Sequence, residues 1–180
     1  MPKSSQVFDN EVRVDPRGGV GGGSATVGTR AIGASGSIVI PIISFSASVS
    51  QNDNFVIHVP MDLDPSRPVR MRMMWIPGAS WSTGNYLWKL DYIVKHETAA
   101  VNTGDPTTLT INVTPANATT MREDEWTTNI YVNLFEAIYC RLWRDVANDN
   151  GDDVGQVSYL ELYYKAFRSG TRIHPGQKPW

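Results

Sequence analysis

Four acidic side chains that lie close together in the sequence could supply ligands for a metal ion. They are Asp145, Asp149, Asp152 and Asp153. Carboxylate oxygens in a flexible loop are ligands that calcium prefers, but the EF-hand pattern also needs a glycine at its sixth position and a glutamate at its twelfth. Counted from Asp145, neither is present. A solvated loop is therefore the favoured interpretation, and calcium binding remains the alternative.

Other residue types that carry out catalysis lack the spacing that their chemistry needs. The glycine-rich residues 17–28 match neither the dinucleotide fingerprint nor a phosphate loop. The histidines His58, His96 and His174 are far apart and show no metal-ligand spacing. The carboxylates of residues 123–125 are adjacent, whereas a glycosidase needs two that face one substrate. We therefore expect no enzymatic activity, no cofactor and no metal, with a carbohydrate-active enzyme on a β-sandwich as a further alternative.

The aromatic side chains offer a different chemistry, the binding of sugars, because the flat faces of Trp and Tyr rings can stack on pyranose rings. Most of the tryptophans lie in alternating segments, where packing in a core is the usual role. Trp81 differs, since it lies between Ser80 and Ser82 in a turn-rich segment. It is the residue that we select for glycan contact.

The segments that must position these residues have the alternating pattern of β-strands. In residues 137–145, for example, Ile138 and Cys140 lie on one face while Tyr139 and Arg141 lie on the other. Eight strands are expected, at Ser37–Phe45, Asn54–Val59, Val69–Ile76, Tyr86–Lys95, Thr108–Thr114, Thr128–Leu134, Ala137–Asp145 and Gly155–Phe167. Residues 121–126 could add one helical turn, with acidic residues suited to its start. The pattern predicts an all-β protein, specifically an eight-stranded antiparallel jelly-roll sandwich.

The first 36 residues contrast with this predicted domain. Their glycine-rich part has few apolar side chains with which to offset its conformational entropy. We therefore expect an extended N-terminal arm that another protein surface holds, as an added strand would be held at a sheet edge. The side chains expected to make these contacts are Phe8, Val12, Val14 and Arg17. The predicted organisation is an arm at 1–36, a β-domain at 37–167 and a tail at 168–180.

Charge and composition exclude several classes of partner. A net charge of −2 gives no electrostatic basis for binding nucleic acid. The first residues lack the apolar region of a secretion signal, and no run is long enough to span a bilayer. The single cysteine, Cys140, permits no internal disulfide and is expected to be a small buried residue. We expect a soluble protein that is synthesised in a cytoplasm and binds neither nucleic acid nor membrane.

Several of the predicted strands carry a recognisable series of residues. The series comprises Tyr-Leu-Trp-Lys-Leu-Asp-Tyr at 86–92, Arg-Leu-Trp-Arg-Asp at 141–145, and Tyr-Leu-Glu-Leu-Tyr-Tyr at 159–164. In this part, from Trp75 to Phe167, the chain resembles small jelly-roll proteins of tailed bacteriophages. These are capsid decoration (cement) proteins and modules of head or tail fibres. The resemblance is a loose profile over roughly half of the chain and does not include the N-terminal arm.

The resemblance implies a structural protein of the virion. The expected function is that of a decoration protein on the outer surface of a tailed-phage head, where a homotrimer would stabilise the capsid by bridging major capsid proteins. Three arms on one trimer would bind with avidity. The alternative is a head- or tail-fibre module that binds a host-surface glycan.

Overall fold

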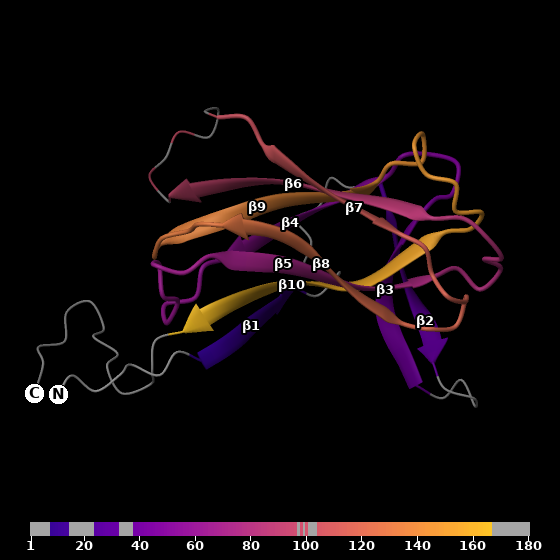
Figure 1. Cartoon of the computed structure of the whole chain (residues 1–180), viewed down its shortest axis with the longest axis horizontal. Helices are drawn as coiled ribbons and strands as arrows, with labels where there is room; N and C mark the ends of the chain where they lie inside the picture. Colours follow the sequence, from indigo (N-terminus) through magenta and orange to yellow (C-terminus); the bar gives the residue numbers. More distant parts are fainter. Residues whose placement is uncertain are drawn as a thin grey trace, which may run out of the picture.

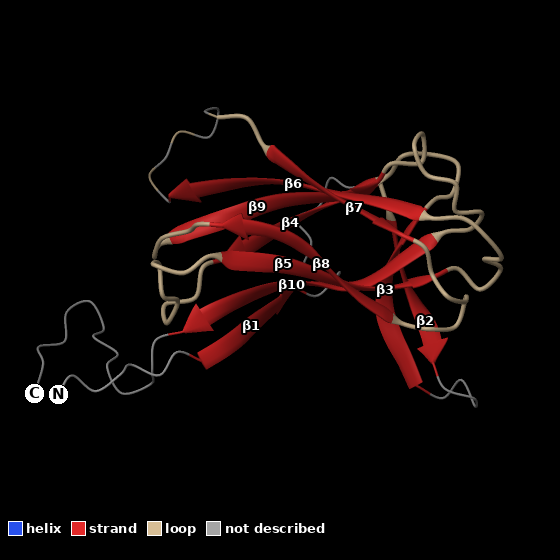
Figure 2. Ribbon diagram, viewed as in Figure 1, coloured by secondary structure: helices blue, strands red, loops and turns tan. Residues whose placement is uncertain are grey.

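A computed structural model describes residues 8–14, 24–32, 38–96, 98, 100 and 104–166 of the chain. These residues form ten β-strands and no helix (Figures 1 and 2). The strands are β1 (Phe8–Val14), β2 (Thr26–Ile32), β3 (Ile38–Phe45), β4 (Asn52–His58), β5 (Val69–Pro77), β6 (Tyr86–His96), β7 (Thr107–Val113), β8 (Arg122–Ile130), β9 (Glu136–Arg144) and β10 (Gly155–Ala166). No helix among the described residues is long and apolar enough to cross a membrane.

The strands form two antiparallel sheets that pack face to face. One sheet has the order β2-β3-β10-β5-β8, with β1 also paired to β10, and the other has the order β4-β9-β6-β7. The last eight strands are nested pairs: β3 with β10, β4 with β9, β5 with β8, and β6 with β7. A long hairpin rolled into two sheets produces this arrangement, which is the jelly roll that the sequence predicted.

The eight strands expected from the sequence correspond to β3 through β10, but the sixth was placed too far along the chain. Residues 122–126, where a helical turn was predicted, form the first part of β8. The reason lies in partners on β5 that the local sequence does not reveal. Glu125 forms ion pairs with Arg70 and Arg72, and Asp124 accepts a hydrogen bond from Trp75 Nε1 at 2.7 Å. These contacts hold the acidic segment extended.

The core lies between the sheets and is rich in aromatic rings. Trp75 and Trp88 from opposite sheets meet edge to face, with centroids 5.4 Å apart, and both are fully buried. Phe45 and Tyr86 complete the cluster through contacts with these rings. Edge-to-face aromatic pairs contribute beyond the area that they bury. Cys140 is buried as expected, and burial raises the pKa of its thiol to about 12.

The N-terminal region contains two strands that pair within the chain's own sheet. β1 runs along the second half of β10, from Phe8 opposite Ala166 to Val14 opposite Leu160. β2 pairs with β3 over its full length. Both strands lie within residues 1–36, for which the sequence predicted an arm held by another protein surface. Residues 15–23, with the predicted contact Arg17, and the tail 168–180 lie outside the described residues.

Strands β2 and β3 form a two-stranded ribbon that extends past the body of the sandwich (Figure 1). Only Ile43, Ser44 and Phe45 of β3 also pair with β10, so residues 38–42 pair with β2 alone. We refer to Thr26–Ile32 together with Ile38–Phe45 as the β2–β3 ribbon. At residues 38–42, β3 therefore has β2 as its only paired strand among the described residues.

Candidate functional site

The outer face of the sheet β4-β9-β6-β7 carries side chains that lie in three rows across the strands. One row is apolar and consists of Val56, Tyr139 and Ile93. The next row is polar and consists of Asn54, Arg141, Asp91 and Thr108. The third is mixed and consists of Asn52, Trp143, Lys89 and Thr110. Side chains directly opposite each other in an antiparallel sheet lie on the same face, so these rows form one continuous surface.

Asp91 organises the polar row. Its carboxylate is almost fully buried although it lies on the outer face. Oδ2 accepts hydrogen bonds from Arg141 Nε at 2.9 Å and from Nη2 at 2.6 Å, and also from Trp143 Nε1 at 3.1 Å. Oδ1 accepts a hydrogen bond from Thr108 Oγ1 at 2.6 Å. One buried carboxylate thus fixes the positions of a guanidinium group and an indole ring.

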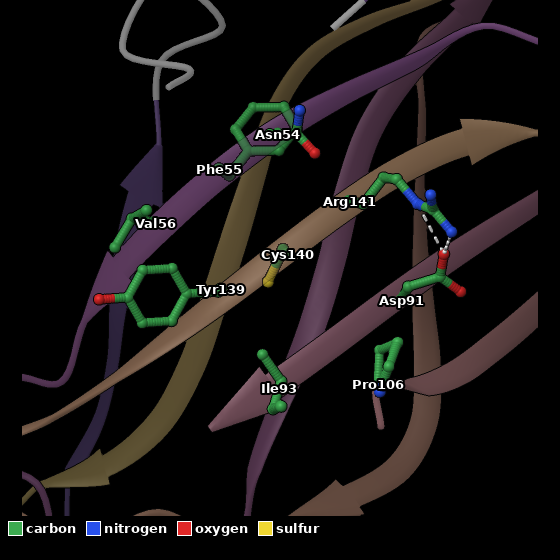
Figure 3. A pocket seen from close by; sticks show the side chains of 9 residues that line it. All are labelled: Asn54, Phe55, Val56, Asp91, Ile93, Pro106, Tyr139, Cys140 and Arg141. Atoms are coloured by element: carbon green, nitrogen blue, oxygen red, sulfur yellow. Dashed lines mark hydrogen bonds and ion pairs between the residues drawn. The ribbon is translucent and has the colours of Figure 1, made fainter. Parts of the chain in front are cut away.

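A groove runs between the apolar and the polar row (Figure 3). Its volume is about 460 Å³, and it is open to solvent. Tyr139 and Ile93 lie on one side of it, while the Arg141–Asp91 pair lies on the other. Tyr139 is 46% exposed as a whole residue, and the Arg141 side chain is 52% exposed. Both are therefore accessible to a ligand in the groove.

A second hollow continues the surface on the far side of Arg141. It has a volume of about 170 Å³ and is lined by Ser50, Gln51, Asn52, Arg141 and Trp143. Lys89 Nζ lies 4.8 Å from the centre of the Trp143 ring and forms an ion pair with Asp145 at 2.5 Å. Arg141 thus separates two adjoining hollows and can reach a ligand in either of them.

The charges on this face are balanced in pairs. Arg141 is neutralised by Asp91, and Lys89 is neutralised by Asp145. The Lys89 ammonium group, by its hydrogen bond, lowers the pKa of Asp145 below its usual value. The hydrogen-bonding groups that remain exposed include side-chain amides and hydroxyls. The chemistry of this surface therefore suits an uncharged ligand with many polar groups.

The acidic cluster from the sequence has a structural role in this fold. Asp145 binds Lys89, and Asp149 forms an ion pair with Arg144 at 2.6 Å. Asp152 accepts hydrogen bonds from Ser82, and Asp153 accepts them from backbone amides. Within the described part of the chain, no three acidic, histidine or cysteine side chains converge as a metal site would require. The expectation of a solvated loop holds for Asp152, but it is wrong for Asp145 and Asp149, which are buried.

Trp81, the residue selected for glycan contact, does not lie on the grooved face. It is only partly exposed and packs against the hydrophobic core. Its indole nitrogen is buried and has no hydrogen-bond partner in the structure. The arm residues Phe8, Val12 and Val14 lie in β1, and their contacts with a capsid stay a prediction.

Sequence reasoning placed the grooved face correctly but gave it no role. The alternation in β9 predicted that Tyr139, Arg141 and Trp143 share one face, and the register confirms this. Two aromatic rings and an arginine on the solvent side of a strand were the signal that could have identified the site. Asp91 could not be recognised in this way, because its partners come from β7 and β9.

Comparisons with known proteins show only distant structural likenesses. No family model matches the chain, and no curated protein matches its sequence. The similar solved structures include a mannan-recognising carbohydrate-binding module, TmCBM27, with a TM-score of 0.45, 10% identity, and coverage of 89% of this chain and 99% of that chain. They also include a family 11 carbohydrate-binding module from Clostridium thermocellum, with a TM-score of 0.42, 16% identity, and coverage of 84% and 94%.

A phage protein is also among the similar structures. It is the enzymatically active domain of tailspike protein 4 of bacteriophage CBA120, with a TM-score of 0.37 and 10% identity. The match covers 90% of this chain but 19% of that chain. Likenesses at these scores assign no ligand to the chain, so the functional argument rests on its own residues.

Proposed function

We propose that this chain is a binding module for an uncharged glycan, which it holds on the outer face of the sheet β4-β9-β6-β7. The proposal rests on two side chains that lie on one face, exposed Tyr139 and half-exposed Arg141. The buried carboxylate of Asp91 holds the Arg141 guanidinium in place. The same face was not part of the sequence-based alternative, which relied on Trp81.

The arrangement of the rows matches the amphipathic character of a sugar ring. A pyranose has C–H groups on its faces and hydroxyl groups around its rim. The face of the Tyr139 ring supplies an apolar surface for the C–H groups. The polar row lies two residues away along β9, a distance of about 7 Å, so it is within reach of the hydroxyl groups.

Arg141 is suited to select hydroxyl-rich ligands. Its Nε and Nη2 atoms donate hydrogen bonds to Asp91, and the residue lines both hollows. A guanidinium that is held in place loses little further freedom when it forms a hydrogen bond with a ligand. The amide of Asn54 beside it can both donate and accept hydrogen bonds.

The size and openness of the surface favour an extended glycan over a single sugar. Tyr139 and Trp143 are four residues apart on β9, and this distance of about 14 Å is enough for roughly three sugar rings. The two hollows adjoin at Arg141, so a ligand can occupy both of them. Because the charges are paired, an acidic glycan gains no general electrostatic advantage.

Substitutions in the groove test this function. Tyr139→Ala and Arg141→Ala should each weaken the binding of a neutral oligosaccharide by at least about tenfold, equivalent to about 1.4 kcal/mol. The probe is the best-bound neutral oligosaccharide from a glycan array, and isothermal titration calorimetry gives the affinity. Removal of the ring eliminates the apolar platform, and removal of the guanidinium eliminates fixed donors.

Tyr131→Ala is the matched control. Tyr131 is 66% exposed, but it does not line either hollow, so its loss should leave binding unchanged. Absence of binding to every glycan on the array, or equal weakening by the Tyr131 variant, would contradict the proposal. Weakening by Trp81→Phe alone would instead favour the loop that the sequence suggested.

The second candidate function is that of a decoration protein on the outer surface of a phage head. It is favoured by the exposed apolar side chains of the β2–β3 ribbon, which suit assembly better than ligand binding. In this proposal a homotrimer bridges major capsid proteins, with Phe8, Val12, Val14 and Arg17 as contact residues. The position of the chain in a virion, on the head lattice or on the tail, distinguishes this function from that of a glycan-binding fibre module.

A further inference from the structure

The outer face of the sheet that contains β5 and β10 has a hollow of its own, on the opposite side of the sandwich from the Tyr139 groove. Its volume is about 330 Å³. The described residues that line it are Arg67, Pro68, Arg70, Tyr163 and Lys165. Three of these residues carry a positive charge and none carries a negative one. We refer to it as the basic hollow.

The two strands direct three of the lining side chains away from the core. Arg70 is exposed between two buried neighbours on β5, while Tyr163 and Lys165 flank the buried Tyr164 on β10. Arg70 and Tyr163 are opposite each other in the register. Lys165 Nζ lies 5.7 Å from the centre of the Tyr163 ring. Two cations from neighbouring strands therefore lie around one aromatic side chain.

The third cation, Arg67, belongs to a turn that is fixed to the end of β10. Asp64 is buried, and its Oδ1 accepts hydrogen bonds from Ser66 N at 3.0 Å and from Ser66 Oγ at 2.7 Å. Asp64 N donates to Lys165 O at 2.9 Å, and Arg67 N donates to Asp64 O at 3.0 Å. Because this backbone is already held in place, ligand binding by the Arg67 side chain orders little further backbone.

The charges of the basic hollow are not all paired, in contrast to those of the grooved face. Arg70 forms an ion pair with Glu125 at 2.9 Å. Asp9 is opposite Lys165 in the register of β1 and β10. Among the described residues, no ion pair involves Arg67, whose side chain is exposed. The hollow therefore contains a guanidinium charge that the rest of the described chain does not neutralise.

We propose that the basic hollow is a second binding site and that it takes an oxyanion group, which is a phosphate, a sulfate or a carboxylate. A guanidinium presents five N–H donors in a rigid fork that matches the oxygens of such a group. The hydrogen bond from Arg70 to Glu125 uses Nη1, so Arg70 as well as Arg67 retains donors for a ligand. Ligand pockets usually measure roughly 300–1,000 Å³, so the hollow also has room for a sugar that carries the charged group.

Titration calorimetry of the full chain at low ionic strength tests this proposal. The probes are glucuronate, a phosphate ester of glucose, a sulfate ester of glucose and inorganic phosphate, and glucose is the neutral reference. At least one charged probe should bind saturably, at least about tenfold more tightly than glucose, and more weakly as salt is added. Arg67→Gln should weaken this binding by at least about tenfold, and Arg67→Gln/Arg70→Gln should weaken it further.

The source of the oxyanion follows from a comparison of two probes. A phosphate ester that binds more tightly than inorganic phosphate identifies a charged sugar as the ligand. Equal affinities identify the free anion. Both results support recognition of an oxyanion.

Arg122→Gln is the matched control, because it removes the same charge from β8 at a position that does not line the basic hollow. It should leave anion binding unchanged. Arg67→Gln should keep the fold, which circular dichroism would verify, and should leave the binding of neutral oligosaccharides unchanged, because Arg67 lines neither hollow of the grooved face. Failure of every charged probe to bind, undiminished binding by Arg67→Gln, or equal weakening by Arg122→Gln would overturn the proposal.

Discussion

Arg144 is a fully buried cation that organises the connection between β9 and β10. Its guanidinium forms a two-bond ion pair with Asp149, through Nε at 2.6 Å and Nη2 at 2.9 Å. It also donates to the backbone carbonyl oxygens of Gly151 and Asp153, and it lies 4.3 Å from the centre of the Tyr86 ring. A buried charge is tolerated when its hydrogen bonds are satisfied in this way. The segment that looked like a metal loop is instead held by an internal arginine.

Removal of this arginine should strongly destabilise the fold. Arg144→Met leaves the buried carboxylate of Asp149 without its partner, and we expect the free energy of unfolding to fall by about 3–5 kcal/mol. Urea denaturation followed by tryptophan fluorescence measures the change. Arg70→Met is the control, since that half-exposed pair with Glu125 should contribute about 0–1 kcal/mol. Equal effects of the two variants would contradict the structural role assigned to Arg144.

At the scale of the elements, the approach of β10 to β6 depends on a glycine at the first position of β10. A Cβ atom on Gly155 would lie 2.6 Å from two atoms of the Trp88 ring. The backbone of β10 therefore packs directly on a core tryptophan from the opposite sheet. Gly155 is also where β10 pairs with both β3 and β5, so a shift at this point would disturb three strands.

A methyl group at this position should be costly. Gly155→Ala forces the Trp88 ring or the strand to move, and we expect a loss of about 1–3 kcal/mol in the free energy of unfolding. A double-mutant cycle with Trp88→Phe checks the cause, because the smaller ring makes room for the methyl group. If Gly155→Ala costs as much in the Trp88→Phe background as alone, the clash is not the source of the loss.

At the scale of the whole molecule, two loops that cross between the sheets are tied together. The loop between β5 and β6 and the loop between β9 and β10 each connect one sheet to the other. Asp153 accepts a hydrogen bond from Ser80 N at 2.8 Å, and Asp152 accepts one from Ser82 Oγ at 2.5 Å. At the same end of the sandwich, Asp145 forms an ion pair with Lys89 of β6. Carboxylates therefore connect both sheets at this end.

Because of these carboxylates, the free energy of unfolding should decrease at acidic pH. Lys89, through its hydrogen bond, lowers the pKa of Asp145 in the folded state. The stabilisation is fully present above the unfolded pKa, about 3.9, and is lost as the pH falls through the lower folded value. Urea denaturation between pH 7 and pH 2 should show a decrease below about pH 4 that is smaller in Lys89→Met than in the unmodified protein.

The variant Asp145→Asn provides the control for this pH dependence. It removes the titrating carboxylate itself, so its acid-induced decrease should be no larger than that of Lys89→Met, in which Asp145 keeps its hydrogen bond from Asn148. The double variant should match Asp145→Asn, because neither of them retains the carboxylate. An undiminished decrease in all three variants would mean that other groups produce the acid sensitivity.

The local sequence determined the strands and their buried faces. Alternation in β9 predicted that Ile138 and Cys140 share one face, because a strand turns successive side chains to opposite faces, and both are buried. It also put Tyr139 and Arg141 together on the other face. The position of β8 was predicted less well, since Glu125 and Asp124 are held in a strand by partners on β5.

Only the tertiary structure decided which residues make a site. Asp91 acquires its role from Arg141 and Thr108, which lie on two neighbouring strands far away in the sequence. Trp81 lies in a loop, as the sequence indicated, but the fold packs it against the core. The sequence placed β2 in the arm and β3 in the β-domain. The exposure of the β2–β3 ribbon follows from the position at which β10 stops pairing with β3. Pairing between distant strands carries this information, and the side-chain pattern of a single strand does not contain it.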